Sequence, residues 1–282
     1  MIDPTTVTGD IIVAGSSTVF PLTERMAEVF AEDGYSGQIT IDSVGTGGGF
    51  ERFCVTGETD IANASRPIDE EEVQACRAIG RTPIEFRVGT DALAVVVSTE
   101  NTFVNDLSRA QLAQIFSGAA KTWNVIDPSY PDEPIQLFSP GSDSGTYDYF
   151  VEEVLDDDAT GLQNSGAQFS ENDSVLVQGV QGSPYAIGYL GFAYYHANRS
   201  TLRVLSVDGV TPTPATAEDG AYPLARPLFI YSDANVMREK PQVAAFINYY
   251  LTFVNDEIGE VGYFAASPEA LEEARQAWLD SQ

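Results

Sequence analysis

The stretch IIVAGSSTVFP at residues 11–21 contains the pattern on which the fold prediction rests. Residues 11–14 form a short apolar run typical of a buried strand, and the next four are glycine and hydroxyl residues that favour a turn. Pro21 suits the first position of a helix, and apolar residues then recur at helical spacing up to residue 33. The stretch therefore predicts a strand, a turn and a helix in succession.

Three other stretches repeat this order of strand, glycine- and hydroxyl-rich run, and helix. They are Gly45-Thr-Gly-Gly-Gly49 before Phe50, Asn63-Ala-Ser-Arg66 before Asp69, and Gly141-Ser-Asp-Ser-Gly-Thr146 before Tyr147. Each would place backbone N–H groups and a helix N-terminus near a small hydroxyl, which is how proteins bind an oxyanion without a large positive field. Turn formation and helix capping are the ordinary roles of these residues, but four such loops together favour an anion site.

Strands and helices alternate along the whole chain, which predicts an α/β fold with mostly parallel sheets. The expected strands are 39–44, 60–64, 92–97, 135–138 and 228–231, and the expected helices are 50–55, 69–79, 108–116, 146–155, 241–253 and 268–279. The runs 175–180, 186–190 and 202–206 continue the alternation, and 209–223 is expected to be loop. A chain of 282 residues is natural for two lobes, so we expect two sheets with a cleft between them.

The charge balance excludes several classes of partner. There are 42 Asp and Glu residues against 14 Lys and Arg, and the formal net charge of −28 argues against nucleic acid and anionic membranes. Lys121 and Lys240 are the only lysines, and an acid-rich, lysine-poor composition fits either a salt-adapted protein or an ordinary acidic secreted one. An anionic ligand would have to be held by local dipoles and a guanidinium rather than by the overall field.

Membrane insertion is not expected. The apolar run at 92–97 has six residues, against about 20 needed to span a bilayer. The start of the chain, from Met1 to Pro4, lacks the basic and apolar parts of a secretory signal. The chain is therefore interpreted either as cytosolic or as a mature exported form.

Signals for catalysis, metal binding and nucleotide binding are weak. Asp143-Ser144-Gly145 is similar to the sequence around a serine-protease nucleophile, but the only histidine is His196, for which a structural role is expected. The run 45–49 lacks the lysine of a P-loop, and no cluster of His, Cys and acids has metal-ligand spacing. We therefore expect no enzyme activity, metal or cofactor. Cys54 and Cys76 are either two free buried thiols or a disulfide.

Two charged residues in the loops have the chemistry to read an oxyanion. Arg66 can grip two oxygens with parallel hydrogen bonds, and its alternative is a salt bridge on an acidic surface; Arg52 is a weaker candidate. Asp143 can accept the proton that hydrogen phosphate carries and sulfate lacks, and its alternative is support of its own loop. Arg66 and Asp143 together therefore predict a protonated tetrahedral oxyanion as ligand.

Taken together, the motifs resemble those of the phosphate-binding proteins (PstS) of phosphate ABC importers, and most closely the branch named SphX in cyanobacteria. The blocks that carry the resemblance are VAGSSTVFPL at 13–22, SVGTGGGF at 43–50, DIANASRPI at 60–68, SDSGT at 142–146, VQGV at 177–180 and IGYLGFAYY at 187–195. They occur in the family's order and cover almost the whole chain.

This resemblance implies a type II periplasmic-binding-protein fold with phosphate buried between two lobes. Lobe one would comprise residues 1–90 and 230–282, and lobe two residues 91–229. The resemblance also implies a Cys54–Cys76 disulfide, a monomer, and a partner that is a membrane-embedded phosphate permease. The protein would be periplasmic or extracellular, anchored in some cases through a segment ahead of residue 1.

Ten residues make up the predicted phosphate site; the resemblance implies Thr18, Val19, Thr46, Ser144, Gly145 and Thr146, and the other four are inferred from the loops themselves. The ten are Ser17, Thr18, Val19, Thr46, Ser65, Arg66, Asp143, Ser144, Gly145 and Thr146. The enterobacterial members have Asp where this chain has Ser65 and Arg where it has Pro140, so we infer that Arg66 and Asp143 supply the exchanged groups. The alternatives are a receptor for sulfate or a phosphonate, a phosphate sensor or scavenger without a transporter, and a hydrolase that uses Ser144.

Overall fold

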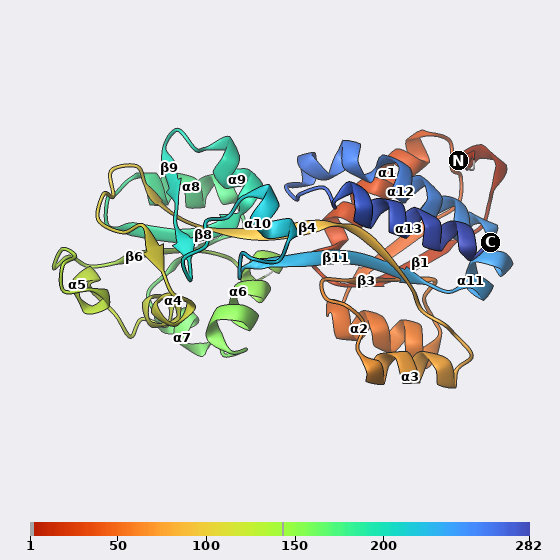
Figure 1. Ribbon diagram of the computed structural model, residues 1–282, viewed down its shortest axis with the longest axis horizontal. Helices are drawn as coiled ribbons and strands as arrows, with labels where there is room; N and C mark the ends of the chain where they lie inside the picture. The colour runs from red at the N-terminus through yellow and green to blue at the C-terminus, as the bar shows by residue number, and fades with distance from the viewer. Residues whose placement is uncertain (1–2, 143) are drawn as a thin grey trace. The chain divides into compact units, whose positions relative to one another are not determined.

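The computed structural model describes residues 3–142 and 144–282. It divides into two compact units, one made of residues up to Thr90 together with Arg226–Gln282, the other of Asp91–Ala225. The chain passes from the first unit to the second inside the long strand β4 (Ile84–Ser98) and returns at the start of β11 (Ala225–Ser232) (Figure 1).

The first unit contains a sheet with the strand order β2 (Ile39–Ser43), β1 (Ile11–Gly15), β3 (Ile61–Ala64) and β11. Strand β1 pairs parallel with both β2 and β3, whereas β11 runs antiparallel to β3. The carboxyl ends of the three parallel strands and the amino end of β11 therefore share one edge of the sheet.

Helices cover both faces of this sheet. Figure 1 shows α1 (Phe20–Glu32), α12 (Pro241–Val261) and α13 (Pro268–Asp280) on one face, and α2 (Gly45–Glu51) and α3 (Glu70–Ala78) on the other. The larger apolar core lies under the first group, and a smaller one lies under the second. The shorter elements of this unit are the 3₁₀ turn η1 (Pro4–Thr6), the π-helical turn η2 (Arg52–Thr56) and the helix α11 (Ala234–Glu239).

A disulfide joins Cys54 in η2 to Cys76 in α3, so the disulfide that the family resemblance implied is confirmed. The bond closes a loop with a sequence separation of 22 residues, which stabilises the folded chain by about 3 kcal/mol in the chain-entropy picture. It lies within the smaller apolar core, beside Phe53.

The second unit has its own sheet, in the order β4, β8 (Ala186–Gly191), β6 (Gln136–Pro140) and β7 (Gln168–Ser170), with β9 (Leu202–Val204) also paired to β4. Strand β6 is parallel to β7 and β8, and β4 is antiparallel to β8. A small parallel pair is formed by β5 (Asp106–Leu107) and β10 (Ser206–Val207). The helices are α4 (Arg109–Phe116), α5 (Trp123–Ile126), α6 (Gly145–Leu155), α7 (Thr160–Asn164), α8 (Asp173–Gln181), α9 (Phe192–Ala197) and α10 (Pro214–Glu218).

The predicted α/β architecture with mostly parallel strand pairs is confirmed, with three local corrections. The run 45–49 is not a loop, because its residues form the start of α2. Residues 175–180 lie in α8, where the buried side chains follow helical spacing rather than alternation. The loop at 209–223 contains α10, which begins after a capping box at Thr213. Across the two described ranges, no helix combines the length and apolar character needed to cross a membrane.

Candidate anion-binding site

The first predicted loop leads directly from β1 into α1. The buried Ser16 starts the helix: its carbonyl accepts the Phe20 amide at 3.0 Å, and its Oγ accepts the Thr18 and Val19 amides at 3.2 and 3.4 Å. Thr18 and Val19 are buried, and Ser17 is partly exposed. The two amides therefore lie at the positive end of α1, as the anion hypothesis requires, and Ser16 Oγ is their acceptor here.

Thr18 has contacts on both its side chain and its backbone. Its Oγ1 accepts a hydrogen bond from Arg226 Nη2, and its carbonyl accepts one from the Tyr263 hydroxyl at 2.7 Å. Arg226 is the second residue of β11 and only 7% exposed. The sequence analysis missed it; the signal that could have found it is an arginine at the head of the apolar run ARPLFIY at 225–231.

The second and third predicted loops come together. Thr46 Oγ1 lies 3.2 Å from Ser65 Oγ and accepts the Ser65 amide at 3.2 Å. The sheet explains this contact, because β2 and β3 are the two neighbours of β1, and the loops that follow them leave from the same edge. Three hydroxyls predicted from sequence, on Thr18, Thr46 and Ser65, thus belong to segments that follow the parallel strands at one edge of the first unit.

A buried polar cluster fixes the end of β3 against α1. Thr23 Oγ1 lies 3.1 Å from Asn63 Oδ1 and 3.3 Å from the Tyr250 hydroxyl. Burial raises the pKa of Tyr250, so this hydroxyl keeps its proton and stays a hydrogen-bond donor. Among the described residues, Asn63 Nδ2 is one of two buried side-chain atoms without a hydrogen-bond partner. The cluster anchors the third loop to the helix that follows the first.

Arg66 lies in the third loop with its guanidinium on a carboxylate. Its Nη1 and Nη2 donate to Glu72 Oε2 and Oε1 at 2.8 and 2.7 Å, and Glu72 also completes the capping box of α3. The Arg66 side chain is 40% exposed and stands 5.6 Å from the centroid of the Phe50 ring. The weaker candidate, Arg52, pairs with Asp42 at 2.5 Å. Both arginines that the sequence analysis singled out are therefore held by acids.

The fourth loop lies in the second unit, between β6 and α6. Ser144 caps α6, because its Oγ accepts the Thr146 amide at 3.2 Å, and its own amide donates to the Gly141 carbonyl at 3.1 Å. Ser144, Gly145 and Thr146 are partly exposed at this helix N-terminus. Asp143, the predicted proton acceptor, lies outside the described residues.

A serine-hydrolase arrangement is not formed by the described residues. His196 is exposed on α9, with its Nε2 2.7 Å from Arg199 Nη1, while Ser144 Oγ is bonded to the Thr146 amide. Within residues 3–142 and 144–282, no group of three His, Cys, Asp or Glu side chains could hold a metal ion. The described loops fit an anion site better than a serine-hydrolase or metal centre.

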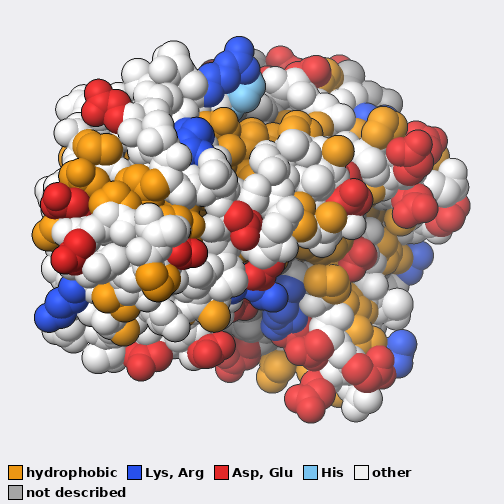
Figure 2. All heavy atoms as spheres, turned by 60° about the vertical axis from the view of Figure 1, so that its left-hand side comes forward, with side chains coloured by type: hydrophobic (Ala, Val, Ile, Leu, Met, Phe, Trp, Pro, Cys, Tyr) orange, Lys and Arg blue, Asp and Glu red, His pale blue; other side chains and the backbone are white. Residues whose placement is uncertain are grey.

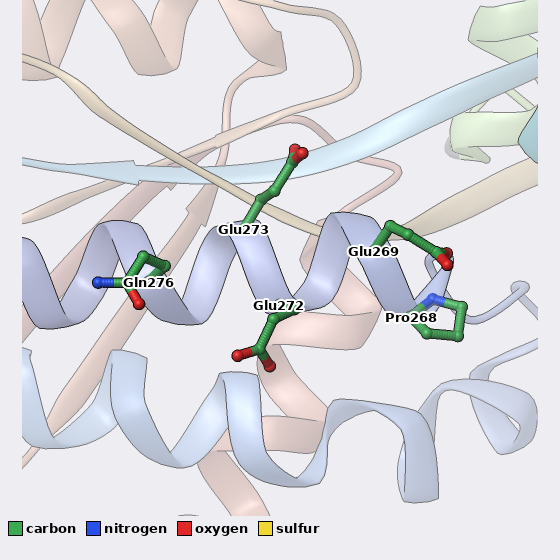
Figure 3. A pocket seen from close by; sticks show the side chains of 5 residues that line it. All are labelled: Pro268, Glu269, Glu272, Glu273 and Gln276. Carbon is green, nitrogen blue, oxygen red and sulfur yellow. The ribbon is translucent and has the colours of Figure 1, made fainter.

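The surface as a whole offers little general attraction for an anion, because the formal net charge is −28. Figure 2 shows acidic side chains spread over the visible face, with fewer basic ones among them. A hollow along α13 is lined by Pro268, Glu269, Glu272, Glu273 and Gln276, three of which are glutamates (Figure 3). An anion would be repelled there, and the predicted loops stand apart from this hollow in offering helix N-termini and hydroxyls.

Comparison with known protein families, relatives and solved structures identifies the class of protein to which this fold and these loops belong. The family model described as "PBP superfamily domain" matches residues 3–252. The chain therefore belongs to the PBP superfamily, the substrate-binding proteins of ABC transporters, and specifically to the group that contains the SphX and PstS proteins.

Three relatives support this assignment. The chain is 43% identical to protein SphX of Synechococcus elongatus over 278 residues, covering 95% of this chain and 81% of SphX. It is 38% identical to the phosphate-binding protein PstS of Staphylococcus haemolyticus over 260 residues, covering 90% and 80%. The crystal structure of a possible phosphate binding protein from Planctomyces limnophilus superposes with a TM-score of 0.87 at 37% identity, covering 98% of this chain and 99% of that one.

These relationships confirm the predicted family and its two-lobed fold. The family consists of binding proteins and not of enzymes, so the hydrolase alternative based on Ser144 is set aside.

Proposed function

We propose that this protein captures inorganic phosphate outside the cytoplasm and delivers it to a membrane-embedded ABC permease. The observation that carries the proposal is that the segments with Thr18, Thr46 and Ser65 leave one edge of the sheet, beside a buried guanidinium. The PstS relative bears the name phosphate-binding protein, which supports phosphate as the ligand. Hydroxyls, amides at a helix N-terminus and a guanidinium together match the donors that a phosphate dianion needs.

The proposed ligand set takes residues from both units. It comprises Ser17, Thr18, Val19, Thr46, Ser65, Arg66, Asp143, Ser144, Gly145 and Thr146. We propose that the two units act as the two lobes of the fold and that the protein works as a monomer without nucleic acid. Because these donors are local, the formal net charge of −28 does not prevent the binding of an anion.

Calorimetric titration of the ligand-stripped protein with phosphate and then with sulfate, at pH 6 and pH 8, tests this proposal. We expect one phosphate per chain and much weaker binding of sulfate. Thr46→Val should raise the Kd for phosphate at least about tenfold, since it removes a hydroxyl donor. The matched control is Thr99→Val, at an exposed position just after β4, which should leave the Kd unchanged.

Three outcomes are distinguishable. Tight binding of phosphate alone supports the phosphate receptor. Equal binding of phosphate and sulfate would replace it with a receptor for tetrahedral oxyanions in general. Absence of heat with both anions, in a protein that remains folded, would reject the anion-binding function.

A further inference from the structure

We propose that Arg226 is the arginine that binds phosphate on the first unit. This inference rests on the proposed function and adds a residue to its ligand set. It gives Arg226 the stronger guanidinium contact with phosphate and leaves Arg66 with the weaker one.

The position of Arg226 in the sheet places it at the predicted loops. Strand β11 is antiparallel to β3, and Phe229 is paired with Ala64, the last residue of β3. Arg226 lies three residues before Phe229 and therefore beyond the carboxyl end of β3, where the Ser65 loop begins. This is the edge of the sheet at which the first, second and third loops also lie.

The hydrogen bond to Thr18 shows that the guanidinium reaches the first loop. Arg226 Nη2 donates to Thr18 Oγ1, so this oxygen acts as an acceptor and the Thr18 hydroxyl proton remains available as a donor. Thr18 is itself held by Tyr263 and by the buried start of α1. An anion that accepts a hydrogen bond from the Thr18 hydroxyl would therefore lie next to the Arg226 guanidinium. The five N–H donors of this planar group suit a phosphate.

Burial distinguishes Arg226 from the other candidates. It is 7% exposed, whereas the side chains of Arg66 and Arg52 are 40% and 37% exposed. Those two lie nearer the solvent, where they meet Glu72 and Asp42. A charge–charge contact made away from water is stronger than one at the surface, so the buried guanidinium contributes more to the affinity.

The test compares arginine variants in the full-length protein. Arg226→Gln removes the charge and the fork, and Arg226→Lys keeps the charge but not the fork. Arg66→Gln tests the competing assignment. Arg81→Gln is the matched control: Arg81 is in the same unit and donates to the Phe53, Gly57 and Thr59 carbonyls, which precede β3 and so lie near the opposite edge of the sheet.

We expect Arg226→Gln to raise the Kd for phosphate about a hundredfold, measured by calorimetry on folded protein, with Arg226→Lys in between. Arg66→Gln should change the Kd by less than about tenfold, and Arg81→Gln should leave it unchanged. Folded Arg226 variants that bind phosphate like the wild type would overturn the inference and leave the phosphate function intact. A wild-type protein that binds no phosphate would overturn both.

A second measurement does not depend on how well the variants fold. In wild-type protein labelled with ¹⁵N-arginine, phosphate should shift the Nε–H signal of Arg226 and leave that of Arg81 in place. An Arg226 signal that stays unchanged while phosphate binds would contradict the proposal.

Discussion

At the scale of single residues, the partners of the arginines separate structural roles from binding. Arg66 and Glu72 are six residues apart and meet as part of the capping of α3. Arg81 is surrounded by backbone carbonyls, and its pKa is lowered by burial. Arg226 is buried and donates a hydrogen bond to a hydroxyl in a predicted ligand loop. In a protein with 42 acidic residues, a guanidinium at the surface meets carboxylates easily, as Arg66 and Arg52 do.

Asp143 provides a prediction about selectivity. If its carboxylate accepts the phosphate proton, Asp143→Asn should lower the ratio of phosphate to sulfate affinity at least about tenfold, since an amide donates to sulfate where a carboxylate repels it. Competition calorimetry with both anions measures this ratio. Asp158→Asn makes the same charge change at the exposed loop where Asp158 accepts the Thr160 amide, and should leave the ratio unchanged. An unaltered ratio in Asp143→Asn would return Asp143 to the role of loop support.

At the scale of elements, the glycine run of α2 has a packing role. Gly49 lies against β1: a Cβ built there would be 2.5 Å from Gly15 Cα and 2.8 Å from the Ala14 carbonyl oxygen. A Cβ at Gly47 would meet no atom within 4 Å. Glycine therefore lets α2 approach the end of β1 closely, and this approach brings Thr46 to Ser65.

This difference predicts opposite effects of alanine at two neighbouring positions. Gly49→Ala should lower the free energy of unfolding by about 1–3 kcal/mol, because α2 must move away from β1. Gly47→Ala should raise it by up to about 1 kcal/mol, because alanine favours the helix at an open position. Denaturant unfolding of both variants under oxidising conditions, with the Cys54–Cys76 bond intact, measures the two values. Equal effects of the two substitutions would contradict the close approach.

At the scale of the whole molecule, the charge sets the response to solution conditions. A formal net charge of −28 creates repulsion within each folded unit, and salt screens repulsion between exposed carboxylates. Raising NaCl from about 0.05 to 1 M at pH 7 should therefore raise the unfolding midpoint by roughly 2–6 °C.

The matched condition is the same salt series near the calculated pI of about 4.1, where the net charge approaches zero. The salt effect should largely disappear there. A rise of equal size at both pH values would mean that the salt acts through the hydration of apolar surface instead of through charge.

Local sequence patterns were sufficient for most of the longer elements and for the segments that make up the candidate site. Glycine and hydroxyl residues between an apolar run and a helical pattern located the Thr18 and Ser65 loops, because turn and capping preferences act over a few residues. The same rule misjudged the run 45–49, where close packing of α2 against β1 rather than turn formation explains the glycines. A local preference of glycine does not distinguish these two uses.

The sequence by itself determined the α/β order, the acidic charge and the four glycine- and hydroxyl-rich segments whose chemistry suits an oxyanion. Only the tertiary structure decided which guanidinium reaches them. Arg66 meets a carboxylate six residues away, whereas Arg226 meets Thr18, which lies 208 residues away in the chain. The physical reason is that this second contact depends on the antiparallel register of β11 against β3. That register pairs residues far apart in the chain, so a local pattern of residues does not reveal it.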